Sequence, residues 1–314
     1  MRPSSTPRSL ALLLCLALQG VACGPPVDTG DGGVDAGPDG GGGEPVQVRV
    51  ATFNTHLFFD DVCDSGACAP GDFEEQRSTS AFQTRAREIA AGIQGLGAQV
   101  VSLQEIENQK AFDAILAELP ASFAHSTFGE TGWPASLDVG LVSTVPLVGI
   151  RRHRDRVLER PDGTRTTFTR EFLEVHLDAD GHRLIVFCAH FRSKWQDDPG
   201  RREAEGAAAG EILAEAALAN PAAGIVLAGD LNDVPGSPAL DALEAAAQVE
   251  RVAAELGSQD VTFEYQGTDY ALDHLYLETS SAGTYRSGTV RVVRDGWGYA
   301  GSDHAAVRAD FLVQ

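Results

Sequence analysis

Apolar and polar residues alternate at the start of the region that follows residue 45. Residues 46–54 form a short alternating run, which predicts a strand with one buried face that ends on the amide side chain of Asn54. Helical spacing then predicts a helix between the N-cap candidate Ser78 and Gly97. Further strands are expected near 99–103, 138–143, 168–177, 183–189, 225–228, 272–276 and 305–311, and further helices near 112–119 and 202–219.

Polar residues with catalytic chemistry fall where these strands begin or end. Capping a turn is a sufficient explanation for any one of them. A repeated placement of carboxylate, amide and imidazole groups is harder to attribute to turns, because strand ends are where sheet scaffolds expose reactive groups. The residues in these positions are Asn54, Glu105, His190, Asp230, Asn232, Asp303 and His304.

This residue set has the parts needed for metal-assisted hydrolysis of a phosphoester. Carboxylate and amide oxygens without thiolates favour Mg²⁺, with Mn²⁺ or Ca²⁺ as alternatives, over Zn²⁺. Two imidazoles supply proton transfer near neutral pH. A divalent ion neutralises a phosphate oxygen, while one histidine takes a proton from water and the other donates one to the leaving oxygen.

Seven short segments, in order along the chain, resemble the signature blocks of the endonuclease/exonuclease/phosphatase superfamily, the deoxyribonuclease I-like proteins. Within that superfamily they look most like bacterial extracellular nucleases. The resemblance covers nearly all of residues 46–314 and implies an α/β (α+β) four-layer sandwich, in which two mixed β-sheets pack face to face with helices outside. The segments are Thr52-Phe53-Asn54, Leu103-Gln104-Glu105-Ile106-Glu107-Asn108, Phe168-Thr169-Arg170-Glu171, Ala189-His190-Phe191-Arg192-Ser193-Lys194, Gly229-Asp230-Leu231-Asn232-Asp233, Leu272-Asp273-His274 and Gly301-Ser302-Asp303-His304.

The resemblance also implies a role for each matching residue. The ion would be held by Asn54 and Glu105, with Asp230, Asn232 and Asp303 completing the metal and nucleophile shell. His190 and His304 would form the acid/base pair, with Asp273 orienting His304. Arg170 would contact a substrate phosphate, and Arg192 and Lys194 are further phosphate candidates because they adjoin His190. Asp138 stands where a carboxylate could orient His190.

The first 45 residues have the layout of an export segment and a tether. Arg2 and Arg8 precede an uncharged apolar run, which predicts a lipoprotein-type signal peptide over 1–22 with Cys23 as the lipidation site. Plain secretion with cleavage near Ala22 is the alternative. Residues 23–45 are rich in Gly, Pro and Asp and predict a disordered tether. The protein is therefore expected to be exported, as an outer-membrane or cell-surface lipoprotein or in secreted form.

Cys63 and Cys68 lie in a Gly/Asp/Pro-rich loop. In an exported chain this spacing favours a small-loop disulfide. A metal half-site is the competing interpretation, but no second Cys or His pair at ligand spacing accompanies it.

Composition narrows the functional classes. The chain has 43% hydrophobic and 22% charged residues and a formal net charge of −21, which excludes disordered, collagen-like and coiled-coil classes. Residues 46–314 retain 40 acidic and 22 basic residues, a net of −18. This charge argues against tight nonspecific binding to nucleic acid. Two interpretations are open for a run of seven arginines: a surface that follows a phosphate backbone, or a solvated loop. These arginines are at 151, 152, 154, 156, 160, 165 and 170.

The leading hypothesis is an exported, metal-dependent nuclease acting on DNA, with RNA as a further substrate. It would contact the membrane only through the lipid anchor, and a monomer with no protein partner is expected. Two alternatives remain. One is a sphingomyelinase-like enzyme acting on a phospholipid or inositol phosphate, although no aromatic pair in a hairpin setting is evident. The other is a non-catalytic surface lipoprotein. Trp297 and Tyr299, just before Asp303, either stack on a substrate group or pack in the core.

Overall fold

The strand predicted at 46–54 becomes part of a central strand in a seven-stranded sheet. In the computed structural model, residues 44–314 are described. The predictions for the signal peptide, for Cys23 and for nearly all of the tether fall on residues 1–43 and lie outside them. The sheet has the order β15-β17-β1-β2-β4-β3, and β16 also pairs with β17. The strands are β1 (Val46–Phe58), β2 (Val100–Ile106), β3 (His125–Gly129), β4 (Asp138–Ser143), β15 (Thr284–Tyr285), β16 (Arg291–Val293) and β17 (Ala306–Val313).

A second sheet of six strands has the order β11-β14-β10-β9-β8-β5. In both sheets a parallel pair lies between antiparallel neighbours: β1 runs parallel to β2, and β9 runs parallel to β10. The strands of the six-stranded sheet are β5 (Leu147–Arg152), β8 (Leu173–Ala179), β9 (His182–His190), β10 (Gly224–Asp230), β11 (Val249–Arg251) and β14 (Asp273–Glu278). Two short hairpins lie outside the sheets, β6 (Leu158–Glu159) with β7 (Arg165–Thr166), and β12 (Phe263–Tyr265) with β13 (Thr268–Tyr270).

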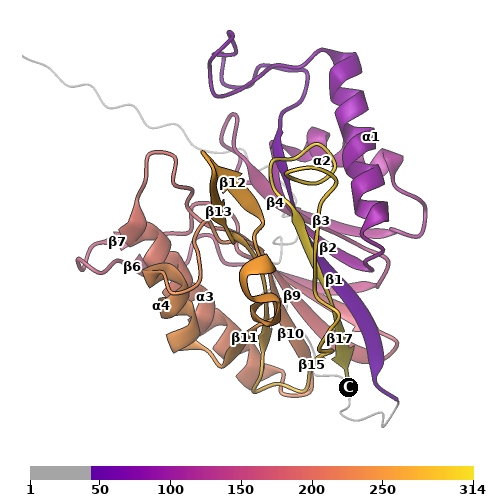
Figure 1. Ribbon diagram of the computed structural model, residues 1–314, viewed down its shortest axis with the longest axis vertical. Helices are drawn as coiled ribbons and strands as arrows, with labels where there is room; N and C mark the ends of the chain where they lie inside the picture. Colours follow the sequence, from indigo (N-terminus) through magenta and orange to yellow (C-terminus); the bar gives the residue numbers. More distant parts are fainter. Residues whose placement is uncertain (1–43) are drawn as a thin grey trace, which may run out of the picture. The chain divides into compact units, whose positions relative to one another are not determined.

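Three apolar clusters hold the layers together. The first joins inward-facing residues of both sheets, such as Val50 and Val226, so the sheets pack face to face. The second joins the other face of the six-stranded sheet to α3 (Pro199–Ala219) and α4 (Pro238–Ala246). The third joins the seven-stranded sheet to α1 (Thr79–Gly95) and α2 (Gln109–Glu118). Figure 1 shows these helix pairs on opposite sides of the sheets, which confirms the expected four-layer sandwich.

The sequence periods located most of these elements and missed several. α1 begins after the N-cap Ser78, as predicted. The strand expected at 168–177 begins only at Leu173, because residues 168–172 form a turn that carries Arg170. α4 was not predicted, nor were β3, β5 and the 3₁₀ helix Val252–Gln259. Within residues 44–314, no helix has both the length and the apolar character that a membrane span requires.

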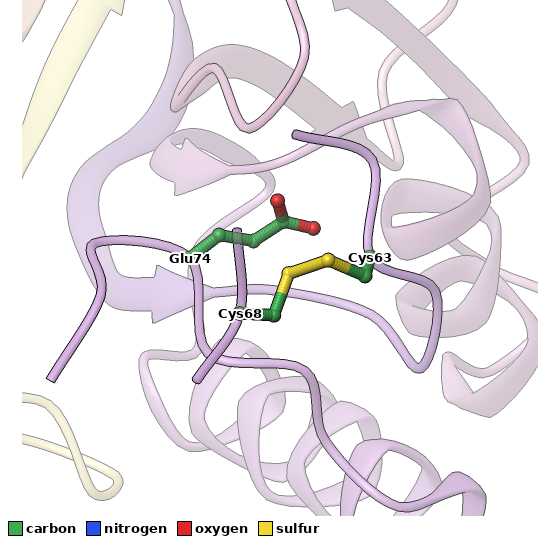
Figure 2. Close-up of side chains that lie close together, drawn as sticks. All are labelled: Cys63, Cys68 and Glu74. Atoms are coloured by element: carbon green, nitrogen blue, oxygen red, sulfur yellow. A yellow bond between two sulfur atoms is a disulfide. The ribbon is translucent and has the colours of Figure 1, made fainter. Parts of the chain in front are cut away.

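The loop between β1 and α1 is fixed by a disulfide and one buried carboxylate. The sulfur atoms of Cys63 and Cys68 are bonded to each other, so they are not available as a metal half-site. The Glu74 carboxylate reaches into this loop (Figure 2) and accepts hydrogen bonds from the backbone N–H groups of Asp64 (2.6 Å) and Ser65 (2.7 Å). The Glu107 carboxylate accepts from the Asp60 N–H at 2.7 Å, which ties the loop to the end of β2.

Two glycines let α3 and α4 approach closely. A Cβ atom at Gly206 would lie 2.0 Å from the backbone oxygen of Ala239, and one at Gly210 would lie 2.6 Å from that of Leu243. Neither position has room for a side chain. Because α4 follows the segment that carries Asp230 and Asn232, this contact positions the loop after β10.

We therefore expect Gly206→Ala to destabilise the fold by about 1–3 kcal/mol, because the helices must separate to relieve the backbone clash. Chemical denaturation of the folded domain measures this change. Gly200→Ala is the matched control in the same helix, since the nearest atom to its Cβ is 3.9 Å away. Equal stability of the two variants would show that the close approach does not constrain α3 and α4.

Candidate active site

A pair of irregularities where β1 and β2 end sets up the site. The register between the two strands shifts after Asn54, and the register between β2 and β4 shifts after Leu103. His56, Leu57 and Glu105 have positive φ values of 56°, 43° and 64°. Residues other than glycine rarely adopt a positive φ, and backbone strain of this kind clusters at functional sites. The Leu57 N–H donates to Glu105 Oε2 at 2.8 Å, which holds the carboxylate at the sheet edge.

Asn54 links the two sheets at this edge. Its side-chain Nδ2 donates to Glu105 Oε1 at 3.1 Å and to Asp230 Oδ2 at 3.0 Å. Its Oδ1 accepts from the His56 N–H at 2.9 Å, which fixes the orientation of the amide. Asn54 therefore presents N–H groups, not oxygen, to the carboxylates. The sequence placed it among the metal ligands, whereas in this arrangement it positions Glu105 and Asp230.

Asp230 and Asn232 follow β10 and form a compact turn. The Asn232 N–H donates to Asp230 Oδ1 at 2.8 Å, and Asn232 has a φ of 53°. The Asn232 Nδ2 donates to the backbone oxygen of Phe191 at 3.1 Å, so its orientation is fixed by the end of β9. Among the described residues its Oδ1 accepts no hydrogen bond and is free to bind an ion or a water.

His190 lies beside both carboxylates. Its Nε2 is 4.0 Å from Glu105 Oε1 and 3.8 Å from Asp230 Oδ2. Both ring nitrogens are buried and have no hydrogen-bond partner within residues 44–314. Burial, followed by the positive charges of Arg170 and His304, holds the pKa of His190 well below its usual value. The ring is therefore neutral, and it is available to a ligand or a substrate.

Among the described residues, no hydrogen bond joins Asp138 to His190. Asp138 Oδ2 accepts instead from the Thr131 N–H at 2.9 Å and from the hydroxyls of Thr131 (3.2 Å) and Ser136 (2.8 Å). These donors belong to the loop that precedes β4, and they turn the carboxylate towards that loop. Asp138 therefore holds the 130–137 loop through Oδ2. Its Oδ1 is buried without a hydrogen-bond partner among the described residues, and the role of Asp138 in orienting His190 stays a prediction.

His304 and Asp273 form a buried dyad. The His304 Nδ1 lies 2.7 Å from Asp273 Oδ2, and the ring of Phe263 packs against the imidazole with centroids 4.8 Å apart. Burial alone would lower the pKa of His304, but the carboxylates, above all Asp273, outweigh burial and raise it to about 10. This contact directs Nε2 away from Asp273.

Sequence reasoning assigned no function to His56, and the structure places it in the site. The His56 Nδ1 lies 2.8 Å from Asp303 Oδ1, and both side chains are partly exposed, at 41% and 45%. The hydrogen bond to Asp303 raises the pKa of His56. Asp303, expected as a metal ligand, is thus paired with an imidazole and is absent from the groups of clustered ligand atoms. The only sequence signal was that His56 follows Asn54 closely.

The cluster fits a divalent cation. Ligand atoms of Glu105, His190 and Asp230 lie within 4.8 Å of one another, and so do those of Asp230, Asp273 and His304. Burial and the nearby Asp273 charge raise the pKa of Asp230 to about 7, a sign that the carboxylates lack sufficient counter-charge. A set of carboxylate oxygens with one imidazole suits a hard divalent ion.

The three predicted phosphate-binding cations border the site, but each also makes contacts within the chain. Arg170 donates to the backbone oxygens of Leu137 (2.7 Å) and Phe191 (3.1 Å). Arg192 donates to the backbone oxygens of Trp195 and Gln196, which closes the loop after β9. Lys194 lies 3.0 Å from an Asp233 carboxylate oxygen, and its side chain is 44% exposed.

Most arginines of the run after residue 150 have hydrogen-bond or ion-pair partners within the chain. Arg151 pairs with Glu174, Arg156 with Glu211 and Glu215, and Arg160 with Asp198. Arg152 and Arg154 donate to the backbone oxygens of Phe128 and Thr131. These arginines therefore bind acidic side chains and backbone oxygens of the chain itself. This favours a solvated loop over a surface that binds a phosphate backbone.

Comparison with known proteins agrees with this geometry. The sequence pattern of the Endonuclease/Exonuclease/phosphatase family matches residues 51–304. A search of the curated proteins finds no match.

Solved structures share the fold at low sequence identity. The human Nocturnin catalytic domain with bound sulfate anion has a TM-score of 0.59 and 17% identity, covering 85% of this chain and 93% of that one. D. rerio TDP2 complexed with single strand DNA product has a TM-score of 0.58 and 15% identity, covering 84% and 98%. SmcL has a TM-score of 0.58 and 18% identity, covering 85% and 99%.

The family pattern spans most of the chain. The chain therefore belongs to the endonuclease/exonuclease/phosphatase family of hydrolases, which act on phosphoester bonds and depend on divalent metals.

Proposed function

We propose that this chain is an exported nuclease that uses Mg²⁺ to hydrolyse phosphodiester bonds of DNA. The observation that carries the proposal is the meeting of two groups at one edge: the carboxylates of Glu105 and Asp230 beside His190, and the His304–Asp273 dyad. Mn²⁺ or Ca²⁺ suits the same oxygen donors.

The residues divide the chemistry between them. Glu105, Asp230 and the free oxygen of Asn232 would hold the ion, which neutralises charge on the phosphate and lowers the pKa of bound water. Asn54 keeps the two carboxylates apart at a fixed separation. His190 and His304 form the acid/base pair: one takes a proton from the attacking water and the other donates one to the leaving oxygen. The Asp273 contact on Nδ1 leaves His304 Nε2 for this transfer.

Nucleic acid is the substrate class best supported by the similar structures. D. rerio TDP2 was solved with a single strand DNA product, and its fold covers most of this chain. Arg170, Arg192 and Lys194 place cations beside His190, where a phosphate backbone would pass. The sequence blocks also look most like those of bacterial extracellular nucleases.

A phospholipid or inositol phosphate is the alternative substrate. The structure contains one aromatic hairpin, β12–β13, beside His304, which the sequence did not reveal. Only Tyr265 in this hairpin is among the strongly exposed aromatic residues, at 57%, so the hairpin does not present the apolar pair that would enter a bilayer. This observation favours the nuclease.

Export is supported by the chain's first 45 residues and by its disulfide. A signal peptide over 1–22 and lipidation at Cys23 would deliver the domain to an oxidising compartment, where the Cys63–Cys68 bond persists.

Incubation of the mature protein with supercoiled plasmid tests the nuclease. We expect cleavage with Mg²⁺ and none after addition of a chelator. His190→Ala is expected to lower kcat by about 10²–10⁴-fold, because general acid–base catalysis supplies that much. Asp273→Asn should lower kcat less, because the imidazole of His304 remains present. Glu118→Gln, on the surface of α2, is the control and should retain full activity.

Chelator-resistant cleavage, or full activity in His190→Ala, would contradict the mechanism. If the plasmid stays intact while sphingomyelin or an inositol phosphate is hydrolysed, the substrate assignment is wrong and the alternative is correct.

Mass spectrometry of the mature N-terminus tests export. We expect a chain that begins at Cys23 and carries acyl groups. A chain that begins at Val21 or earlier would contradict processing at this position, and an unmodified chain beginning just after Ala22 would favour plain secretion.

A further inference from the structure

All three tryptophans of the chain are exposed to solvent. Trp133, Trp195 and Trp297 have exposed fractions of 69%, 72% and 76%. Tyr299, by contrast, is 8% exposed and donates its hydroxyl to the backbone oxygen of Gly92 at 2.8 Å, so it belongs to the core. Indoles are among the side chains that gain most from burial. When exposed indole rings lie on one face of a protein, their exposure indicates that this face binds a partner.

The three indoles lie on loops that leave the sandwich at the catalytic edge. Trp133 is in the 130–137 loop before β4, which pairs with the end of β2 that carries Glu105. Trp195 follows β9, which ends at His190. Trp297 precedes β17, which runs antiparallel to β1 and therefore begins beside the end of β1. The three loops thus border the proposed active site.

The indoles have no internal ring partner. None of the aromatic ring pairs or cation–π contacts found within the described part of the chain includes a tryptophan. Their faces are therefore available for stacking on a flat ligand.

Local charge favours a nucleic acid at Trp195. Arg192 and Lys194 precede it closely in sequence, and the Arg192 guanidinium donates to its backbone oxygen at 3.3 Å. An indole that follows two cations suits a nucleotide, because the base can stack on the ring while the phosphate lies near the positive charges.

The surroundings of the other two indoles disfavour a lipid bilayer. Trp133 borders a surface hollow of about 240 Å³ that is also lined by Asp64, Glu107 and Glu130. Asp295 lies two residues before Trp297. Immersing these carboxylates in hydrocarbon would be costly. A stacked base leaves these carboxylates hydrated, and a carboxylate can accept a hydrogen bond from the amino group of a base.

We propose that Trp133, Trp195 and Trp297 form a stacking rim that binds unpaired bases of a single-stranded nucleic acid around the catalytic groups. The proposal rests on the proposed nuclease function and adds that the substrate is single-stranded or locally unpaired. A duplex hides the faces of its bases, so it cannot occupy the rim without being opened.

Tryptophan fluorescence tests the rim directly, because its three indoles are the only ones in the chain. The full mature protein is titrated in EDTA, which prevents hydrolysis, with a single-stranded oligodeoxynucleotide, with the duplex of the same sequence and with phosphatidylcholine vesicles. We expect saturable quenching by the single strand, binding of the duplex at least about tenfold weaker, and no response to vesicles.

Variants then locate the contacts. Trp133→Ala, Trp195→Ala and Trp297→Ala are each expected to weaken binding of the single strand by about tenfold, in keeping with the loss of one stacked base. Leu218→Ala is the control, because it removes a side chain that is 85% exposed near the end of α3, away from the catalytic edge. Unchanged thermal unfolding of all four variants would show that the fold is intact.

Equal affinity for single strand and duplex, unchanged affinity in the three tryptophan variants, or a blue shift on vesicles would overturn the proposal. The outcome is separable from the nuclease test. Metal-dependent cleavage of DNA without quenching refutes the rim alone, whereas quenching without cleavage supports the rim and refutes the nuclease.

Discussion

One buried amide joins the two sheets at the edge where the site lies. Asn54, at the end of β1, donates to Glu105 from β2 and to Asp230 from β10, so a residue of one sheet holds a carboxylate of each. These acids repel each other without a cation between them, and the pKa of Asp230 rises as a result of burial and crowding. The edge thus gathers acidic groups that could bind a divalent cation. Helix packing outside, including the close contact of α3 and α4, keeps the loop after β10 where this constraint requires it.

Strain is concentrated at the same edge. Glu105 and Asn232 have positive φ values, and so do His56 and Leu57. Glu105 and Asn232 belong to the site, the His56 side chain pairs with Asp303, and the Leu57 N–H binds Glu105. The surrounding sheets supply the packing that maintains these conformations, because the residues on both sides of the shifts are fully buried. Rigid strands therefore present the reactive groups, and the loops beyond them carry the residues proposed to contact the substrate.

The sequence could predict the elements that carry the chemistry. Alternation located β1, and the short apolar runs located β2 and β10; each polar group at their ends lies in the site. The dyad of His304 and Asp273 followed from a resemblance, not from periodicity. α4 was missed because the segment has only nine residues, which is short for a periodic signal, although Ser237 before Pro238 is a helix-start signal.

Side-chain pairing across the fold could not be predicted. Nothing in the sequence indicates that His56 meets Asp303, because the two residues come from opposite ends of the domain and are adjacent only through the pairing of β1 with β17. The hydroxyl groups of Thr131 and Ser136 that bind Asp138 Oδ2 were likewise not evident from the sequence. The net charge of the domain says little about the site, since the proposed substrate contacts are a few local cations and indole rings.

Calorimetric titration of Mg²⁺ into the apo protein is the most direct measurement of whether this edge is a cation site. We expect binding to the wild-type protein and a loss of at least about tenfold in affinity in Glu105→Gln, because one charged oxygen donor is replaced by a neutral one. Glu118→Gln, on the exposed surface of α2, should bind the ion as the wild type does. Unchanged Mg²⁺ affinity in Glu105→Gln would contradict the assignment of the two carboxylates to a metal centre.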